Sequence, residues 1–286
     1  MYTFYVALRF ILRTLIFLFV LAVCAIFISH LVMAPSNIRD WSNDQDTLAY
    51  AQVVASSSIV TLHNIRNFTY ASTTSYNKSY YDRTVDVRTI KRVWYIVEPF
   101  SGIPGSAHTF LSFEFEDETF LAVSVEIRKE KGEEFNPIKG LFDQYELMYV
   151  WADERDAVKL RTNYRKDKLY MYPIKSTPEK VQKLFMHMIN RTNDLVDHPE
   201  FYNTITNTCT TNIVDAVNQV SPGKIAMLNL GVLFPESSDK MAYNLGLFDV
   251  EVGTPFSEVR KMYYVNDKAL KYADDVDFST KIRTQQ

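Results

Sequence analysis

The chain has 286 residues, 47% of them hydrophobic, which is enough to bury one large core or two small ones. A formal net charge of -3 and a pI near 6.0 give no electrostatic reason to expect nucleic acid as a partner. The 18 Tyr and 19 Phe against 8 Gly favour a β-containing core over a lean helical bundle.

The N-terminal region carries the clearest signal. Residues 14–33 are uncharged, and such a run is long enough for a helix to cross the hydrocarbon layer. Arg9 and Arg13 precede it and, by the positive-inside rule, keep the N-terminus in the cytoplasm. A cleaved signal peptide is the main alternative, but no small-x-small site ends the run and Pro35 follows it. We therefore predict a single-pass protein of a bacterial inner membrane whose main domain is periplasmic.

The exported part is predicted to be α+β, an antiparallel sheet packed with helices. We expect a cytoplasmic N-terminus and transmembrane anchor over 1–34, a polar linker leading into an amphipathic helix over 35–55, one domain over 56–262 and a loosely held polar tail over 263–286. Strand-like composition or period-two alternation marks residues 59–62, 64–70, 91–97, 108–115, 120–127 and 168–173. Helical patterns cover residues 140–155, a segment starting at 177–178 with proline at its first turn, and residues 209–220.

One cysteine of the exported part stands alone. Cys24 lies in the membrane segment, so Cys209 has no intramolecular partner and a disulfide within the domain is excluded. A buried structural thiol is the common reading of such a residue. A polar run precedes Cys209, however, and the helical pattern starts there, so the helix N-terminus favours a thiolate and offers donors for an oxyanion. Asn207 and Thr208 are natural caps for the same helix end.

A thiol nucleophile needs a base, and histidine is the usual one. Of the four exported histidines, His63 has no evident partner, His187 lies on the edge of an amphipathic helix and His198 lies in an acidic turn. His108 opens a strand directly after a loop dense in turn formers, where a ring can project beyond the sheet edge. We select His108, although a structural histidine is an open alternative.

A third group would orient that ring. Glu126 lies beside His108 if the intervening hairpin has a three-residue loop, and faces away with a two-residue loop. Ser124 and Glu114 are the alternatives. Either glutamate, Glu126 or Glu114, could instead be a solvated residue of the sheet.

Several motifs together resemble the Lnb-type N-terminal periplasmic domain. They are Ala107-His108-Thr109-Phe110, Ser124-Val125-Glu126-Ile127-Arg128, Gly140-Leu141-Phe142, Tyr145-Glu146-Leu147, Asp153-Glu154-Arg155-Asp156, Leu160-Arg161-Thr162-Asn163-Tyr164-Arg165 and Phe201-Tyr202-Asn203 leading to Cys209-Thr210-Thr211-Asn212-Ile213. The order of histidine on a strand and then cysteine opening a helix also resembles circularly permuted papain-like folds, including lecithin:retinol acyltransferase relatives.

The resemblance implies a thiol-dependent acyl transfer in the envelope, from a phospholipid to the amino group of a lipoprotein. It implies Cys209 as nucleophile, His108 as base and acid, and Glu126 as the orienting group. Membrane lipid and a lipoprotein substrate are then the expected partners. No metal cluster, phosphate loop or dinucleotide fingerprint occurs in the sequence, so no cofactor or metal is expected.

Two other readings remain open at this point. A papain-like hydrolase acting on peptides or peptidoglycan would have an open polar groove beside Cys209, whereas an acyltransferase would have an apolar channel. A non-catalytic envelope module would bury Cys209 and keep His108 distant.

Overall fold

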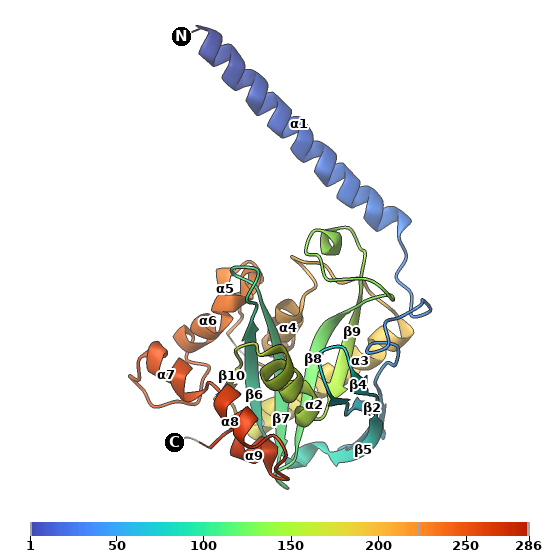
Figure 1. Cartoon of the computed structure of the whole chain (residues 1–286), viewed down its shortest axis with the longest axis vertical. Coiled ribbons are helices and arrows are strands. Elements are labelled where there is room, and N and C mark those ends of the chain that lie inside the picture. The colour runs from blue at the N-terminus through green and yellow to red at the C-terminus, as the bar shows by residue number, and fades with distance from the viewer. Residues whose placement is uncertain (1, 222, 285–286) are drawn as a thin grey trace.

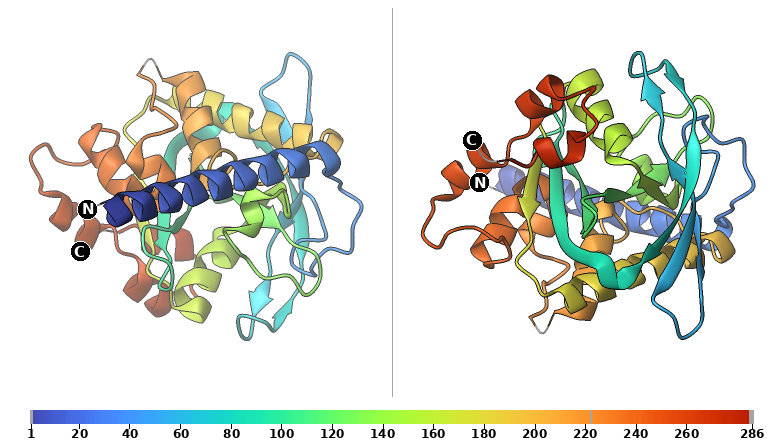
Figure 2. Two further views of the ribbon diagram at one scale, coloured as in Figure 1. Left: turned by 90° about the horizontal axis from the view of Figure 1, so that it is seen from above. Right: turned by 90° about the horizontal axis from the view of Figure 1, so that it is seen from below.

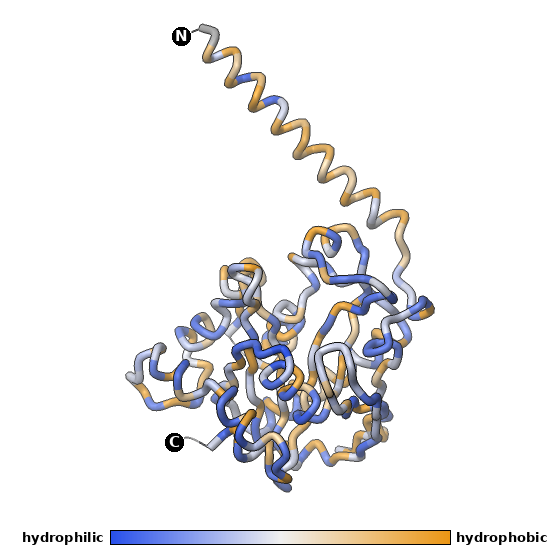
Figure 3. Tube along the Cα trace, in the orientation of Figure 1, coloured by the Kyte–Doolittle hydropathy of each residue, from blue (hydrophilic) through white to orange (hydrophobic). Residues whose placement is uncertain are grey.

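The computed structural model describes residues 2–221 and 223–284 and begins with a long isolated helix. Helix α1 (Tyr2–Val32) stands away from the rest of the chain (Figure 1), and Figure 3 shows it apolar along most of its length. Over Phe4–Ser29 it has the length and composition to cross a membrane, with none of that span buried. Helix α1 is longer than the predicted charge-free run, since residues 2–13 continue it toward the N-terminus.

The remainder is built around an eight-stranded sheet. Seven strands run in the order β1-β2-β9-β8-β7-β6-β10, and β5 also pairs with β2. All these pairs are antiparallel except β2 with β9. Their bounds are β1 Tyr50–Val53, β2 Ile59–Arg66, β5 Tyr80–Asp86, β6 Ile90–Pro99, β7 Ala107–Phe115, β8 Phe120–Arg128, β9 Glu146–Ala152 and β10 Tyr170–Pro173, with a separate ribbon of β3 Thr69–Tyr70 and β4 Tyr76–Asn77. The sheet is strongly bent when seen from below (Figure 2).

Helices cover both faces of the sheet, which confirms the α+β class. The longer ones are α3 Pro178–Asp197 and α4 Cys209–Val220; the shorter ones are α2 Glu154–Lys159, α5 Leu230–Leu233, α6 Ser238–Asn244, α7 Phe256–Met262, α8 Asn266–Lys271 and α9 Phe278–Lys281, with a π-helical segment η3 Leu160–Arg165 and single 3-10 turns η1 Val87–Thr89, η2 Lys139–Leu141 and η4 Pro235–Ser237. In Figure 1, α2 lies in front of the sheet and α3 and α4 lie behind it. We call these sides the front face and the rear face.

Alternation along β7 assigns side chains to the two faces, because successive residues of a strand point to opposite sides. Phe113 packs edge-on against Phe185 of α3 with ring centroids 5.0 Å apart, so Thr109, Leu111 and Phe113 belong to the rear face. His108, Phe110, Ser112 and Glu114 therefore face the front. The front face carries a buried ion-pair network in addition to apolar residues such as Phe110 and Phe278.

Three local expectations are corrected by the fold. Residues 146–152, expected to be helical, form the central strand β9; all seven are buried, so the run carries no alternation that would distinguish strand from helix. Residues 35–55 form no helix. They contain strand β1 and the buried Trp41, and therefore pack against the domain. The expected loose tail contains α8 and α9, because Ala269, Phe278 and Ile282 are fully buried in the core.

Candidate active site

Cys209 is the first residue of α4, and a capping box fixes that helix end. Thr208 is the N-cap residue: its hydroxyl accepts a hydrogen bond from the Thr211 amide at 3.2 Å, and its own amide donates to the Thr211 hydroxyl at 2.7 Å. This reciprocal pair satisfies backbone groups that the first turn would otherwise leave unbonded. The thiol side chain is nearly enclosed, since Cys209 is 9% exposed.

Asn207 serves the loop before α4. Its side-chain oxygen accepts from Asn212 at 2.8 Å, and its amide nitrogen donates to the Phe201 carbonyl at 2.9 Å. These contacts tie the loop to the first turn of α4. The Asn207 amide is thereby engaged within the protein, whereas the cap itself is made by Thr208.

The thiol lies on the rear face of the sheet. Its sulfur is 3.8 Å from the Thr210 hydroxyl, which in turn lies 2.9 Å from the hydroxyl of Thr109 on β7. Burial raises the pKa of Tyr202, and the neighbouring Cys209 thiol raises it further.

An apolar cavity of about 80 Å³ lies beside this cluster, between α4, α6 and strands β6 and β7. Its walls are the residues Val93, Tyr95, Leu111, Ile174, Leu184, Thr210, Ile213, Val214, Val217, Ile225, Ser238, Met241, Ala242 and Leu247. The Tyr95 and Ser238 hydroxyls are among the few polar groups in its walls, and Tyr95 donates a hydrogen bond to Ser238 at 2.8 Å. The wall next to the thiol is therefore suited to hydrocarbon and offers little to a peptide.

His108 lies on the front face and belongs to a different cluster. Its Nε2 atom is 2.6 Å from the Ser124 hydroxyl, which donates to Glu126 at 2.8 Å, and Glu126 itself is 3.9 Å from Nε2. The hairpin register pairs Phe110 with Ser124, so Glu126 comes on the same face as His108. Glu114, the other acid considered, accepts from the indole of Trp94 at 2.8 Å and does not belong to this cluster.

Arg161 organises the front cluster. It is 2% exposed, bonds Glu98 at 2.7 Å and Glu126 at 3.0 Å, and stacks over Phe110 at 4.7 Å. Burial would raise the pKa of Glu126, but Arg161, His108, Arg66 and Arg165 together outweigh it and hold that pKa well below its usual range. Burial, with Arg161 adding to it, lowers the pKa of His108 to about 3. The imidazole is therefore neutral at physiological pH.

The structure thus brings His108, Ser124 and Glu126 together, and Cys209 stands outside this hydrogen-bonded group. Thr109 reaches the rear face and contacts Thr210, whereas the preceding His108 turns to the front. Within residues 2–221 and 223–284, no hydrogen bond or ion pair links Cys209 to His108. Both residues stand at the same end of the sheet, because β7 and α4 each begin there (Figure 1), but on opposite faces.

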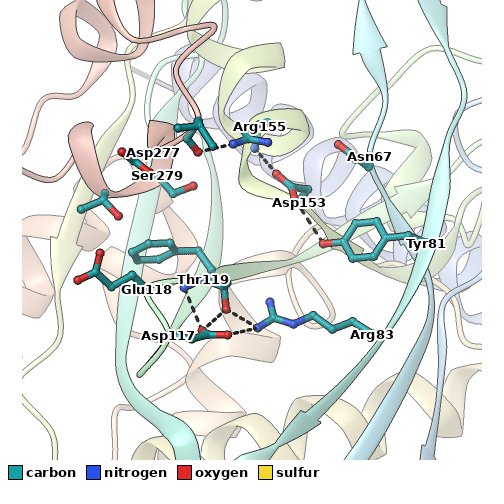
Figure 4. Close-up of a pocket in the computed structure, with 13 residues that line it drawn as sticks. Asn67, Tyr81, Arg83, Asp117, Glu118, Thr119, Asp153, Arg155, Asp277 and Ser279 are labelled. Carbon is teal, nitrogen blue, oxygen red and sulfur yellow. Dashed lines mark hydrogen bonds and ion pairs between the residues drawn. The ribbon is translucent and has the colours of Figure 1, made fainter.

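A larger cavity of about 630 Å³ lies elsewhere, on the front side between β5, the β7–β8 hairpin and α9, and is lined by none of the predicted site residues. Its polar groups partner one another (Figure 4): Tyr81 donates to Asp153 at 3.4 Å, and Arg83 lies 3.7 Å from Asp117. These contacts pair part of the charge on its walls.

The chain thus combines an N-terminal helix, long and apolar enough to cross a membrane, with an α+β domain. Over residues 76–234, more than half of its length, the chain matches the family described as the Lnb N-terminal periplasmic domain, and it belongs to that family. The resemblance to the Lnb-type domain is therefore confirmed, whereas the resemblance to permuted papain-like folds is not. Comparisons with curated proteins and with solved structures gave no match. The family and α1 together fit a single-pass membrane protein with a periplasmic domain.

Arg161 and Glu98 received no role from the sequence, although one signal pointed to them. Glu98 ends the apolar stretch Trp94-Tyr95-Ile96-Val97 of β6, and an acid at that place in a buried strand requires a cationic partner. The Leu160–Arg165 segment contains such a cation.

Proposed function

We propose that this protein is a membrane-anchored, thiol-dependent acyltransferase of the periplasm, with Cys209 as the residue that carries the acyl group. One observation carries the proposal: the thiol opens a capped helix whose next residue, Thr210, lines an apolar cavity. The family, a periplasmic domain, and the apolar helix α1 support action at a membrane.

The reaction would run in two displacements. The Cys209 thiol gives up its proton, and the thiolate attacks the ester carbonyl of a phospholipid to form a carbon–sulfur bond. The ester carbon–oxygen bond breaks, and the lysophospholipid leaves with the proton that the thiol released. An amino group, such as that of a lipoprotein, then attacks the thioester; the carbon–nitrogen bond forms, the thiolate is released and the amine gives up a proton. The amide donors of the first α4 turn are the groups that would stabilise the oxyanion.

The cavity supports the transferase over a hydrolase. A peptidase needs an open polar groove for main-chain hydrogen bonds, whereas the space beside Cys209 is closed by aliphatic side chains of α4. Its volume holds a short stretch of acyl chain, so the remainder would extend outward between α4 and α6.

His108 and Glu126 would act as base and orienting group only after a rearrangement. In the present geometry the ring faces the front, so a proton transfer to or from Cys209 requires the first residues of β7 to turn over the end of the sheet. If instead the helix N-terminus alone activates the thiol, His108 acts as a structural member of the Arg161 cluster.

A second function, a non-catalytic envelope module, is favoured by a specific observation. Cys209 is nearly enclosed and His108 lies on the other face of the sheet. In such a module the thiol is a small core residue, and its replacement by serine leaves the role of the protein intact.

The deciding experiment is acyl-thioester trapping on the full chain in detergent micelles with phospholipid carrying a labelled acyl chain. The Cys24→Ser chain should become labelled, lose the label to hydroxylamine, and transfer it to an added lipopeptide amine. Adding Cys209→Ser should abolish the thioester. Adding His108→Ala then separates the two activation routes, since loss of labelling indicates that the ring takes part and retained labelling assigns activation to the helix end. Absence of label from the Cys24→Ser chain, with its fold intact, would leave the module reading in place.

A further inference from the structure

The end of the domain that joins α1 exposes apolar side chains from four separate segments. Ile103 belongs to the β6–β7 loop, Phe135 and Ile138 to the β8–β9 loop, Ile205 to the loop before α4, and Leu230 and Phe234 to α5 and its end. We call these six residues the apolar rim. All are exposed, with Ile138 at 66% and Leu230 at 69%. Isolated exposed apolar residues are ordinary on protein surfaces, but their gathering at one end requires an explanation.

Contacts join these segments in two neighbouring pairs. The Thr204 hydroxyl donates to the Pro137 carbonyl at 2.7 Å, which joins the loop before α4 to the β8–β9 loop. The Glu236 carboxylate accepts from the Gly105 amide at 2.6 Å, which joins the end of α5 to the β6–β7 loop. Figure 1 shows the same arrangement, with α5 beside the β6–β7 turn and the β8–β9 loop nearest to α1.

The connection to α1 is short and held at both ends. Helix α1 ends at Val32, and the Ser36 amide already donates to Glu146 at the start of β9, at 3.1 Å. The Asn37 amide group donates to the carbonyls of Leu195 and Val196, each at 2.9 Å. With at most about 3.5 Å per residue, residues 33–35 let Ser36 lie no more than about 14 Å from the end of α1. If α1 spans a bilayer, this end of the domain cannot leave its surface.

We propose that the apolar rim inserts into the interfacial layer of the membrane that holds α1, so that the domain docks on the lipid surface in one orientation. The occupant is the bilayer because the tether brings lipid to this end of the molecule and the side chains there are aliphatic and aromatic. Lys139, next to Ile138, adds an exposed cation at the height of the headgroups.

The docking does not depend on the chemistry proposed above. It rests on the tether and the rim, and it holds equally for an enzyme and for a non-catalytic module. It does affect Cys209, because Ile205 lies four residues before the thiol in the same loop. A docked rim keeps the start of α4 at the lipid surface.

The test measures the depth of single sites in the full chain reconstituted in phosphatidylcholine vesicles. Ile138→Cys and Leu230→Cys, each in the Cys24→Ser background, carry an environment-sensitive fluorophore, and lipids with a nitroxide high on the acyl chain act as quencher. The matched control is Leu270→Cys on α8, a leucine with the same 69% exposure as Leu230 but at the lower part of the domain in Figure 1. The Cys24→Ser chain without an added cysteine gives the background from Cys209.

Insertion to about 5–10 Å below the headgroup boundary predicts blue-shifted emission and loss of most of the fluorescence at both rim sites, with little quenching at position 270. Quenching at positions 138 and 230 no stronger than at position 270 would overturn the docking. Because the assay reads position and requires no turnover, its result is independent of thioester trapping.

Discussion

The two faces of the sheet are buried by different means. The rear face is closed by aromatic and aliphatic packing, in which Phe185 of α3 meets Phe113 at 5.0 Å and Trp151 at 5.3 Å. The front face also buries apolar residues, but it adds buried ion pairs, among them Arg161 with Glu98 at 2.7 Å. On a closely packed face, the unfolding free energy falls gradually with the side-chain volume removed. In a buried ion pair, removal of one partner leaves the other charge uncompensated. The candidate nucleophile lies on the packed face and the candidate base in the charged network.

The largest effect is expected on the rear face. Phe185→Ala removes a fully buried ring and leaves a cavity between α3 and the sheet, which should cost about 3–5 kcal/mol of unfolding free energy. Urea unfolding of the full chain in detergent, followed by tryptophan fluorescence, measures it. Phe185→Leu is the control and should lose clearly less; equal losses would show that ring volume does not determine stability on this face.

On the front face, Arg161→Met should cost about 3 kcal/mol, the low end for breaking a buried ion pair. Two carboxylates lose their cation, but Glu126 keeps the Ser124 hydroxyl and Glu98 keeps Arg165 at 3.7 Å. Adding Glu98→Gln and Glu126→Gln to Arg161→Met should recover much of the loss, because no uncompensated charge is then buried.

The contrast fails if the triple variant is less stable than Arg161→Met alone. Arg88→Ala serves as control, since its ion pair with Asp86 is solvent-exposed and its loss should leave the stability almost unchanged.

The titration of His108 gives a third, pH-dependent distinction. The folded-state pKa is about 3 against an ordinary value of 6.5, so below pH 6.5 the unfolded chain binds a proton that the folded chain does not. His108 therefore stabilises the protein above pH 6.5, and this contribution falls by about 1.4 kcal/mol per pH unit as the pH drops toward 3.

The measurement is the stability of the wild type minus that of His108→Gln between pH 6.5 and 4.5. Burial raises the pKa of Glu98 to about 7, so its titration changes the stability with pH in the opposite direction. Glu98 is present in both chains, and its contribution cancels in the difference. Glu98→Gln should accordingly change the slope with the opposite sign. A His108→Gln difference that does not vary with pH would place the imidazole in contact with solvent.

How far the sequence predicts this molecule depends on the range of the interactions involved. Strands β7 and β8 were predicted to within one residue at each end, because turn formers flank them and β8 alternates. The start of α3 was predicted from proline at its first turn, a purely local rule. Strand β1 and helices α8 and α9 were missed, since their burial depends on partners far away in the chain.

The candidate site divides in the same way. The position of Cys209 at a helix start followed from the preceding polar residues. The face on which His108 lies could not be predicted, because β7 is buried on both sides and its sequence does not mark which side α4 will cover. The Glu126 register was open for a related reason and was decided by the geometry of the hairpin.

The smallest predicted effect concerns the cap of α4. Thr208→Ala removes the hydroxyl that accepts from the Thr211 amide, which should cost about 1 kcal/mol, while Thr208→Ser should retain nearly all of the stability. Thiol-reagent labelling of Cys209 in the Cys24→Ser chain provides the second readout. If the ordered first turn shields the thiol, Thr208→Ala labels faster than Thr208→Ser. Equal rates would mean that exposure of the thiol is set by the sheet and the loop before α4, and would place the control of Cys209 outside its own helix.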